Sequence, residues 1–214
     1  MSGRPGSAAA MLAVVALLAG GGTAEAQPTG GSSHDITAAA LEGINSRYLL
    51  QAHYGKAVTD QDFPGQFQLI AFGYTFCPDV CPTTLVEVAK VMDLLGERSA
   101  RVQPLFITVD PERDTLRVLR TYVEFFHPRI LGLRGSPELT RRVADHYRVR
   151  YEKVQEPGAA PEHYAVDHTA GLYLLGPDGA FVTKFAYGTA PKDIADRLSA
   201  LIEANPLPPA RDRH

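Results

Sequence analysis

Residues 67–85 read FQLIAFGYTFCPDVCPTTL and join a near-continuous apolar run to both cysteines of the chain, Cys77 and Cys81. The run FQLIAFG has the length and the apolarity of a strand that is buried on both faces, as in a parallel sheet. From Pro82 to Leu95, apolar residues recur at helical spacing, which predicts a helix. The two cysteines are therefore expected where a buried strand ends and a helix begins.

The rest of the chain continues this alternation of strands and helices. The predicted elements are a hairpin over Arg47–Val58, strands over Val102–Val109, Ile130–Leu133 and Val149–Val154, helices over Thr115–Phe126 and Ser136–His146, a hairpin of Thr169–Leu175 with Ala180–Ala186, and a helix over Pro191–Ala204. This order predicts an α/β fold of thioredoxin-like layout, with a central sheet covered by helices on both faces. In such sheets the chemistry takes place at the carboxyl ends of the strands, where the cysteines are expected.

Composition indicates one globular domain. The chain has 214 residues, of which 45% are hydrophobic and 21% charged, and its formal net charge is −3. This is enough apolar mass for a core. No Lys/Arg-rich run is present to neutralise phosphates, so we expect no nucleic-acid partner. We predict a domain over residues 45–204, preceded by a polar linker over 27–44 and followed by a flexible tail over 205–214.

The amino terminus has the pattern of an export signal. Arg4 precedes an unbroken run of small and apolar residues, Ala8–Ala19, and residues 24–26 read AEA, an A-x-A cleavage site. About twelve apolar residues are too few for a membrane-spanning helix, which needs about 20. We predict that residues 1–26 are a signal peptide, with an uncleaved anchor as the alternative. The protein is then expected in the periplasm or at the outer face of the inner membrane.

The cysteine pair has three interpretations: a structural disulfide, a redox pair, or two ligands of a metal. Exported thiols tend to be oxidised, but a disulfide that closes only three intervening residues stabilises a fold little. A helix start favours thiolates, and thiolates serve both disulfide exchange and the binding of soft metals. Position alone does not decide between the redox and the metal interpretations.

A third ligand would favour the metal interpretation. Two sulfurs are too few for a structural zinc site, whereas Cu(I) accepts two or three thiolate and imidazole ligands. In thioredoxin-like proteins a proline packs against the cysteines just before a strand, and here His168 precedes the strand predicted from Thr169. We therefore predict His168 as the third ligand and His163 as a secondary candidate. The other histidines are expected to be structural or solvated: His34, His53, His127, His146 and His214.

Three stretches of the chain resemble the Sco/SenC family, thioredoxin-fold copper proteins that serve cytochrome c oxidase assembly. They are GYTFCPDVCPTTL at 73–85, FITVDPERDT at 106–115 and DHT at 167–169. The resemblance implies that Cys77, Cys81 and His168 bind copper, as Cu(I), Cu(II) or both, and that the thiols are reduced before loading. It implies a copper chaperone that has a redox-active cysteine pair, Cys77 and Cys81, and that delivers copper to the binuclear copper centre of cytochrome c oxidase. We expect a metallochaperone more than an enzyme, with thiol–disulfide oxidoreductase activity as the enzymatic alternative.

Partners and alternatives follow from the same residues. The expected partners are the copper-binding subunit of the oxidase, a thioredoxin-like reductant and another periplasmic copper chaperone.

The alternative function is a thiol–disulfide oxidoreductase that reduces the cysteines of the oxidase copper site and carries no metal. A peroxidase of the peroxiredoxin type, suggested by Thr75, fits Pro78 and Cys81 poorly. Asp110 either orients the loop or a partner, or caps the following turn. Asp79 either tunes the local charge or contacts the recipient, or is a solvated turn residue.

Overall fold

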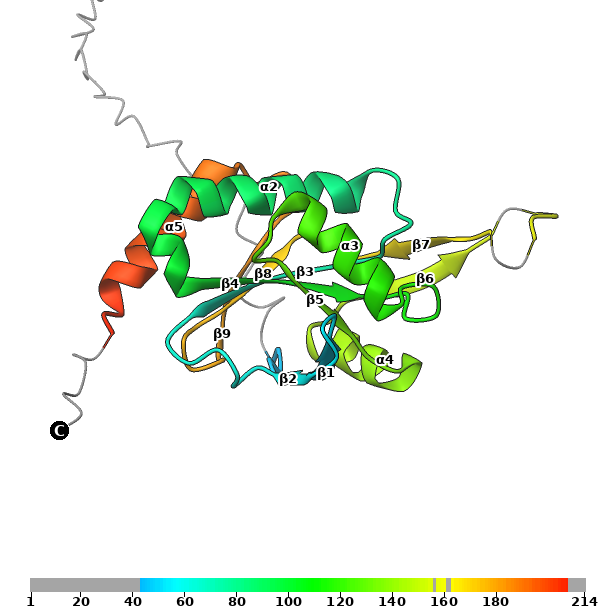
Figure 1. The fold of residues 1–214 in the computed structure, drawn as a ribbon, viewed down its shortest axis with the longest axis horizontal. Coiled ribbons are helices and arrows are strands. Elements are labelled where there is room, and N and C mark those ends of the chain that lie inside the picture. Colours follow the sequence, from blue (N-terminus) through cyan, green and yellow to red (C-terminus); the bar gives the residue numbers. More distant parts are fainter. Residues whose placement is uncertain (1–42, 156, 161–162, 208–214) are drawn as a thin grey trace, which may run out of the picture. The chain divides into compact units, whose positions relative to one another are not determined.

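A mixed sheet forms the centre of the computed structural model, which describes residues 43–155, 157–160 and 163–207 (Figure 1). From edge to edge the strands are β2 (Ala57–Thr59), β1 (Leu49–Ala52), β5 (Leu131–Arg134), β4 (Val102–Thr108), β3 (Phe67–Gly73), β8 (Leu172–Leu175) and β9 (Phe181–Phe185). The central strands β3, β4 and β5 are parallel, whereas β8 runs antiparallel to β3. Every residue of β3 is buried, as its apolar run predicts.

The register of the parallel strands brings two loops together at one edge of the sheet. Gly73, the last residue of β3, pairs with Thr108, the last residue of β4. The segments that follow these two strands therefore leave the sheet side by side. The first carries the cysteines, and the second carries the stretch from Val109 to Thr115.

Helices cover both faces of the sheet, as the sequence predicts. Figure 1 shows α2 (Val80–Leu95), α3 (Leu116–Phe126) and α5 (Pro191–Ala204) on one face and α4 (Pro137–His146) on the other. A 3₁₀ helix, η1 (Gly96–Arg101), links α2 to β4. The hydroxyl of Ser136 accepts a hydrogen bond from the Leu139 amide and caps α4, with Pro137 at its first position. This start was expected because a capping hydroxyl and proline suit the unpaired first turn of a helix.

One prediction at the carboxyl half of the sheet is wrong. The sequence pattern predicts a strand from Thr169, but β8 begins at Leu172, and a separate strand, β7 (Ala165–His168), precedes it. The chain turns between them at Gly171, whose φ is +110° and whose added β-carbon would lie 2.5 Å from the Phe185 carbonyl oxygen. Only glycine fits such a turn without strain. His168 therefore ends one strand instead of preceding another.

Strand β7 pairs antiparallel with β6 (Tyr151–Val154), and this pair forms a ribbon outside the main sheet. In Figure 1 the ribbon extends away from the sheet next to the loop that follows β3. Strand β6 lies within the strand predicted over Val149–Val154, whereas β7, in which only Val166 is fully buried, was not predicted. A short strand with one buried residue has almost no hydrophobic periodicity.

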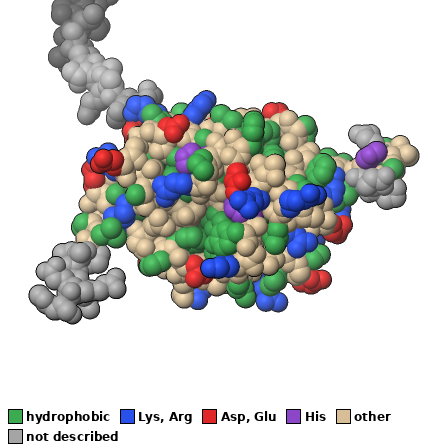
Figure 2. Space-filling model, in the orientation of Figure 1, with side chains coloured by type: hydrophobic (Ala, Val, Ile, Leu, Met, Phe, Trp, Pro, Cys, Tyr) green, Lys and Arg blue, Asp and Glu red, His purple; other side chains and the backbone are tan. Residues whose placement is uncertain are grey.

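Several predictions fall outside the described residues. These are the signal peptide over 1–26, most of the linker, most of the tail, and the histidines His34 and His214. Within the described ranges, no helix combines the length and apolarity that a membrane span requires. On the face shown in Figure 2, Lys and Arg side chains are interspersed with acidic and apolar ones, so that face carries no continuous patch of one charge.

Candidate metal centre

The two cysteines lie on a loop that folds back over the start of α2. Cys81 is in the first turn of the helix and only 2% exposed, whereas Cys77 is partly buried in the loop. The Cys77 amide donates to the Tyr74 carbonyl over 3.3 Å, and the Cys81 amide donates to Cys77 Sγ over 3.4 Å. Both cysteines are free thiols. The loop thus holds Cys77 above the buried sulfur of Cys81.

His168 completes a three-residue group at this place. Its Nε2 lies 3.4 Å from Cys81 Sγ, although the two residues are 87 positions apart in the chain. The ligand atoms of Cys77, Cys81 and His168 all lie within 4.8 Å of one another. In the described part of the chain, this is the group of histidine, cysteine and acidic residues with the spacing to hold a metal ion. The structure therefore brings together the three residues that the sequence predicts as ligands.

The second ring nitrogen of His168 is anchored by the backbone. Nδ1 lies 3.2 Å from the Thr169 carbonyl oxygen, so this nitrogen carries the proton and donates to that oxygen. Nε2 is then left with its lone pair directed at the sulfurs. Burial lowers the pKa of His168, opposed by the hydrogen bond to Thr169, so the neutral ring is favoured. A neutral imidazole whose other nitrogen is hydrogen-bonded is the usual form of a metal ligand.

Burial dominates the chemistry of the inner sulfur. It raises the pKa of the Cys81 thiol well above its ordinary value, and the neighbouring Cys77 raises it further. The sequence predicts that the helix start favours a thiolate here, but the loss of hydration at Cys81 outweighs that effect. A buried thiol of this kind keeps its proton until a cation takes the proton's place, so metal binding at Cys81 is coupled to proton release.

Two residues that the sequence pattern did not single out shape the space around the sulfurs. A β-carbon on Gly73 would lie 2.7 Å from Cys81 Sγ and 2.8 Å from the Phe106 ring, so a side chain there would displace the sulfur. The buried ring of Tyr74 stands edge-on to the His168 ring, with 6.1 Å between centroids and an interplanar angle of 87°. Glycine and tyrosine in an apolar run carry no sequence signal for these roles.

A buried carboxylate ties the cysteine loop to the end of β4. Asp114, which is 0% exposed, accepts hydrogen bonds from the amide and the hydroxyl of Thr75 and from the hydroxyl of Thr108. Burial raises the pKa of Asp114, while these three donors lower it. Asp110 was a predicted site residue and Asp114 was not, because nothing in FITVDPERDT distinguishes one acid from the other.

The other two acidic candidates have different surroundings. The Asp110 side chain is fully buried, forms an ion pair with Arg113, and accepts a 2.8 Å hydrogen bond from the Tyr164 hydroxyl. Asp110 thus contacts the segment that leads into β7, and its orientation of the cysteine loop or of a partner stays a prediction. Asp79 is exposed at the start of α2, and its side chain makes no capping hydrogen bond. Its contact with a recipient stays a prediction.

The remaining described histidines lie away from the sulfurs. Nδ1 of His53 accepts from the Gly132 amide, Nδ1 of His127 accepts from the Arg129 amide, and Nδ1 of His146 lies 2.8 Å from the Arg47 carbonyl oxygen. These hydrogen bonds agree with the structural roles that are expected for the three histidines. His163 is exposed in the loop between β6 and β7 and is not in the three-residue group.

Comparisons of sequence identify relatives of this chain. A family model described as SCO1/SenC matches residues 37–203. Protein SCO2 homolog, mitochondrial, of Bos taurus is 42% identical over 153 residues, which are 71% of this chain and 57% of that protein. Protein SCO1 homolog, mitochondrial, of Homo sapiens is 42% identical over 158 residues, which are 73% of this chain and 52% of that protein. The matched region thus spans little more than half the length of these relatives.

Comparisons of structure agree with the sequence matches. The crystal structure of Arabidopsis thaliana ScoI with copper bound has a TM-score of 0.69 and 38% identity, and the match covers 75% of this chain and 99% of that one. Bradyrhizobium japonicum ScoI with copper bound has a TM-score of 0.66 and 41% identity, over 72% and 97% of the two chains. The matching fold, together with the family model over most of the sequence, shows that this chain belongs to the SCO1/SenC family.

Proposed function

We propose that this protein is an exported copper chaperone that delivers copper to the binuclear copper centre of cytochrome c oxidase. The observation that carries the proposal is the 3.4 Å approach of His168 Nε2 to the buried Cys81 sulfur. Two thiols and one imidazole are a soft donor set, which suits copper better than magnesium or calcium. Both solved structures that are compared with this chain above have copper bound.

The arrangement of the donors suits cargo that must be released. Cys81 is buried, while Cys77 and His168 are partly buried and partly accessible. Loading would replace the thiol protons, and the Thr169 carbonyl would hold the imidazole in place. A donor set of three leaves one side of the ion open to a recipient's ligand. Exchange can then begin before the ion leaves its donor.

The thiols must be reduced before they can bind copper. A disulfide between Cys77 and Cys81 would consume both thiolate ligands, so a reductant must supply two electrons to restore them. We propose a thioredoxin-like reductant for this step. We further propose another periplasmic copper chaperone as the donor and the copper-binding subunit of the oxidase as the recipient. Residues 1–26 support action in the periplasm or at the outer face of the inner membrane.

Titration of the reduced protein with Cu(I) or Cu(II) tests this function. We expect one equivalent to bind, with sulfur-to-copper charge transfer in the absorption spectrum of the Cu(II) form. His168→Ala should weaken binding and change the spectrum, whereas His146→Ala should not, because His146 lies away from the sulfurs at the end of α4. If His168→Ala bound copper with unchanged affinity and spectrum, His168 would not be a ligand, and the proposed chaperone function would be wrong.

A thiol–disulfide oxidoreductase is the second candidate. The partly exposed Cys77 accepts an N–H hydrogen bond from Cys81, an arrangement that offers an accessible sulfur for attack with a buried thiol behind it. Such an enzyme would reduce the recipient's disulfide and end with its own cysteines oxidised. It has no use for an imidazole beside the sulfurs. A deletion strain that is rescued by His168→Ala but not by Cys77→Ser would favour this second function.

A further inference from the structure

The ligand His168 is carried by the ribbon and not by the main sheet. In the described part of the chain, β6 and β7 pair only with each other. The distance between His168 and the cysteine loop therefore depends on the contacts that tie the ribbon to the rest of the domain. Tyr74 packs against His168 and Arg141 stacks on Tyr151, and the residues that follow β4 contribute two further ties.

The buried one of these two ties is a closed group of three residues, which we call the Arg113 clamp: Asp110, Arg113 and Tyr164. Arg113 Nε forms an ion pair with Asp110, and Arg113 Nη1 donates to the Tyr164 carbonyl oxygen over 2.8 Å. The guanidinium carbon also lies 3.6 Å from the centroid of the Tyr164 ring. The Tyr164 hydroxyl closes the group by donating to Asp110. The side chains of Arg113 and Asp110 are 16% and 0% exposed, so water screens these contacts little.

The clamp contacts two segments that carry ligands, the one that leads to His168 and the one that carries Cys77. Side chains alternate along a strand, so Tyr164, Val166 and His168 face the same side of the ribbon. Arg113 contacts this side at Tyr164, and its guanidinium carbon lies 4.9 Å from the centroid of the Phe76 ring, next to Cys77 in the loop. One guanidinium thus contacts the segment leading to the imidazole and the loop that carries the outer thiol.

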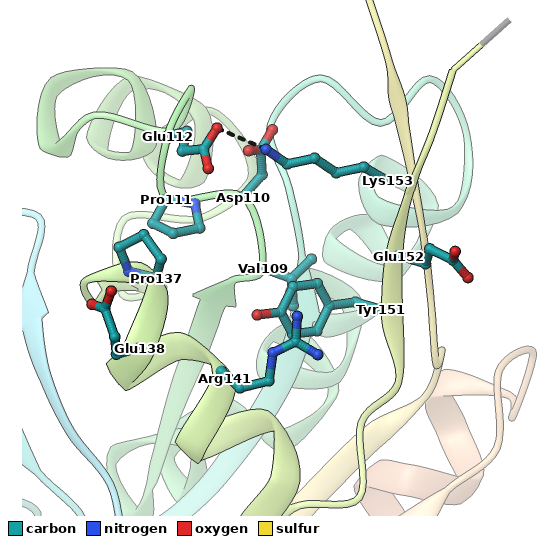
Figure 3. A pocket seen from close by; sticks show the side chains of 10 residues that line it. All are labelled: Val109, Asp110, Pro111, Glu112, Pro137, Glu138, Arg141, Tyr151, Glu152 and Lys153. Carbon is teal, nitrogen blue, oxygen red and sulfur yellow. Dashed lines mark hydrogen bonds and ion pairs between the residues drawn. The ribbon is translucent and has the colours of Figure 1, made fainter.

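The second tie between the ribbon and this region is weaker. Figure 3 shows Lys153 of β6 reaching Glu112 across a cavity of about 710 Å³ beside the ribbon. The two charged groups are 2.7 Å apart, but their side chains are 47% and 59% exposed. Exposed ion pairs of this kind contribute little to stability because water and salt screen them. The Arg113 clamp is therefore the stronger of the two ties.

We propose that Arg113 is a positioning residue that holds the ribbon so that His168 stays within bonding reach of a copper ion on the two sulfurs. This inference rests on the proposed function and adds a positioning residue to the same site. Arg113 touches no ligand atom in this role and acts only through His168. Cu(II) should depend on the clamp more than Cu(I), because two thiolates satisfy Cu(I) whereas Cu(II) prefers additional nitrogen ligands.

A double-mutant cycle separates positioning from general stability. In the reduced protein, Arg113→Met should lower Cu(II) affinity about tenfold, as expected for loss of hydrogen bonds to a charged group, and should shift the charge-transfer band towards that of His168→Ala. Cu(I) affinity should fall much less. When His168→Ala is already present, Arg113→Met should change Cu(II) affinity no further. A further loss in that background equal to the loss in the wild type would overturn the proposal.

One conservative change and two matched control variants make the test specific. Tyr164→Phe removes only the hydroxyl bond to Asp110 and should give a smaller loss of Cu(II) affinity in the same direction. Tyr151→Phe alters a tyrosine on β6 that stacks on Arg141 and should have no effect. Arg120→Met removes an exposed ion pair with Glu124 on α3 and should also have none. If Arg113→Met does not fold, Tyr164→Phe carries the same cycle with His168→Ala.

A measurement on the copper-free protein distinguishes failure of the clamp from failure of the proposed function. Hydrogen exchange of the amides of β6 and β7 should accelerate in Arg113→Met and Tyr164→Phe but not in either control. If the wild type bound no copper, the proposed function would fall, and faster ribbon exchange would still support the clamp. Unchanged exchange in both clamp variants would overturn the clamp, whatever the protein binds.

Discussion

Replacing Gly73 with alanine tests how tightly the fold packs around the inner sulfur. A β-carbon on Gly73 would lie 2.7 Å from Cys81 Sγ and 2.8 Å from the Phe106 ring. These neighbours are 2% and 1% exposed, so neither can move without displacing other core groups. Gly73 is not among the glycines with positive φ, so its backbone accepts alanine. The effect therefore comes from packing and not from backbone strain.

The magnitude follows from two opposing terms. Overpacking of a core costs about 1–3 kcal/mol, while alanine in place of glycine recovers about 0.4–1 kcal/mol by restricting the unfolded chain. We expect Gly73→Ala to lower the free energy of unfolding of the reduced, copper-free protein by about 1–2 kcal/mol. Because the displaced atom is a predicted copper ligand, copper affinity should fall as well. Urea unfolding and copper titration measure the two effects separately.

Gly132→Ala is the matched control. A β-carbon on Gly132 would lie 2.6 Å from Leu119 Cγ, and the next neighbour is His53, so no cysteine is involved. This variant should lose a similar amount of stability and keep its copper affinity. If Gly73→Ala matched the wild type in both unfolding and copper binding, the sulfur would be free to shift, and the packing argument would be wrong.

Three further changes probe the supports of the site and the fold. Asp114→Asn presents an amide to three hydrogen-bond donors, so we expect a loss of about 1–3 kcal/mol in urea unfolding; wild-type stability would refute the role of this carboxylate. Burial holds the pKa of His53 below its usual 6.5 in the folded state, so the wild type should lose stability as the pH falls below about 6.5. His53→Gln should lose less over the same range, and parallel pH profiles would contradict this. Ser136→Ala removes the cap of α4 and should cost about 1 kcal/mol while leaving copper titrations unchanged; altered copper binding would show that α4 is coupled to the site.

Elements with a strong local pattern were predicted well from the sequence. The strand over residues 67–73 and the helix over 191–204 have the predicted bounds. The first is an uninterrupted apolar run, and the second begins with a proline at its first position. Strand β7 was missed because it buries a single residue, Val166, and its pairing with β6 is a long-range contact that leaves no periodic signal.

The candidate site shows the same division. Cys77 and Cys81 are close in sequence, so a strand, a loop and a helix start were enough to predict that their sulfurs would be neighbours. His168 was predicted through the expected fold and the family resemblance, although it ends β7 instead of preceding the strand expected from Thr169. Asp114 and Arg113, which support these three residues, were not predicted from the sequence. Their partners, Thr75 and Tyr164, lie 39 and 51 positions away in the chain.

The sequence alone determined that a thiol pair stands at the end of a buried strand, because short-range apolar patterning dictates which segments become strands and helices. Only the tertiary structure decided that Asp114 ties down the cysteine loop, that Arg113 holds the ribbon, and that an imidazole comes within 3.4 Å of a sulfur 87 residues away. The physical reason is that such contacts arise from the joint packing of distant segments. No one segment carries the information that specifies its partner.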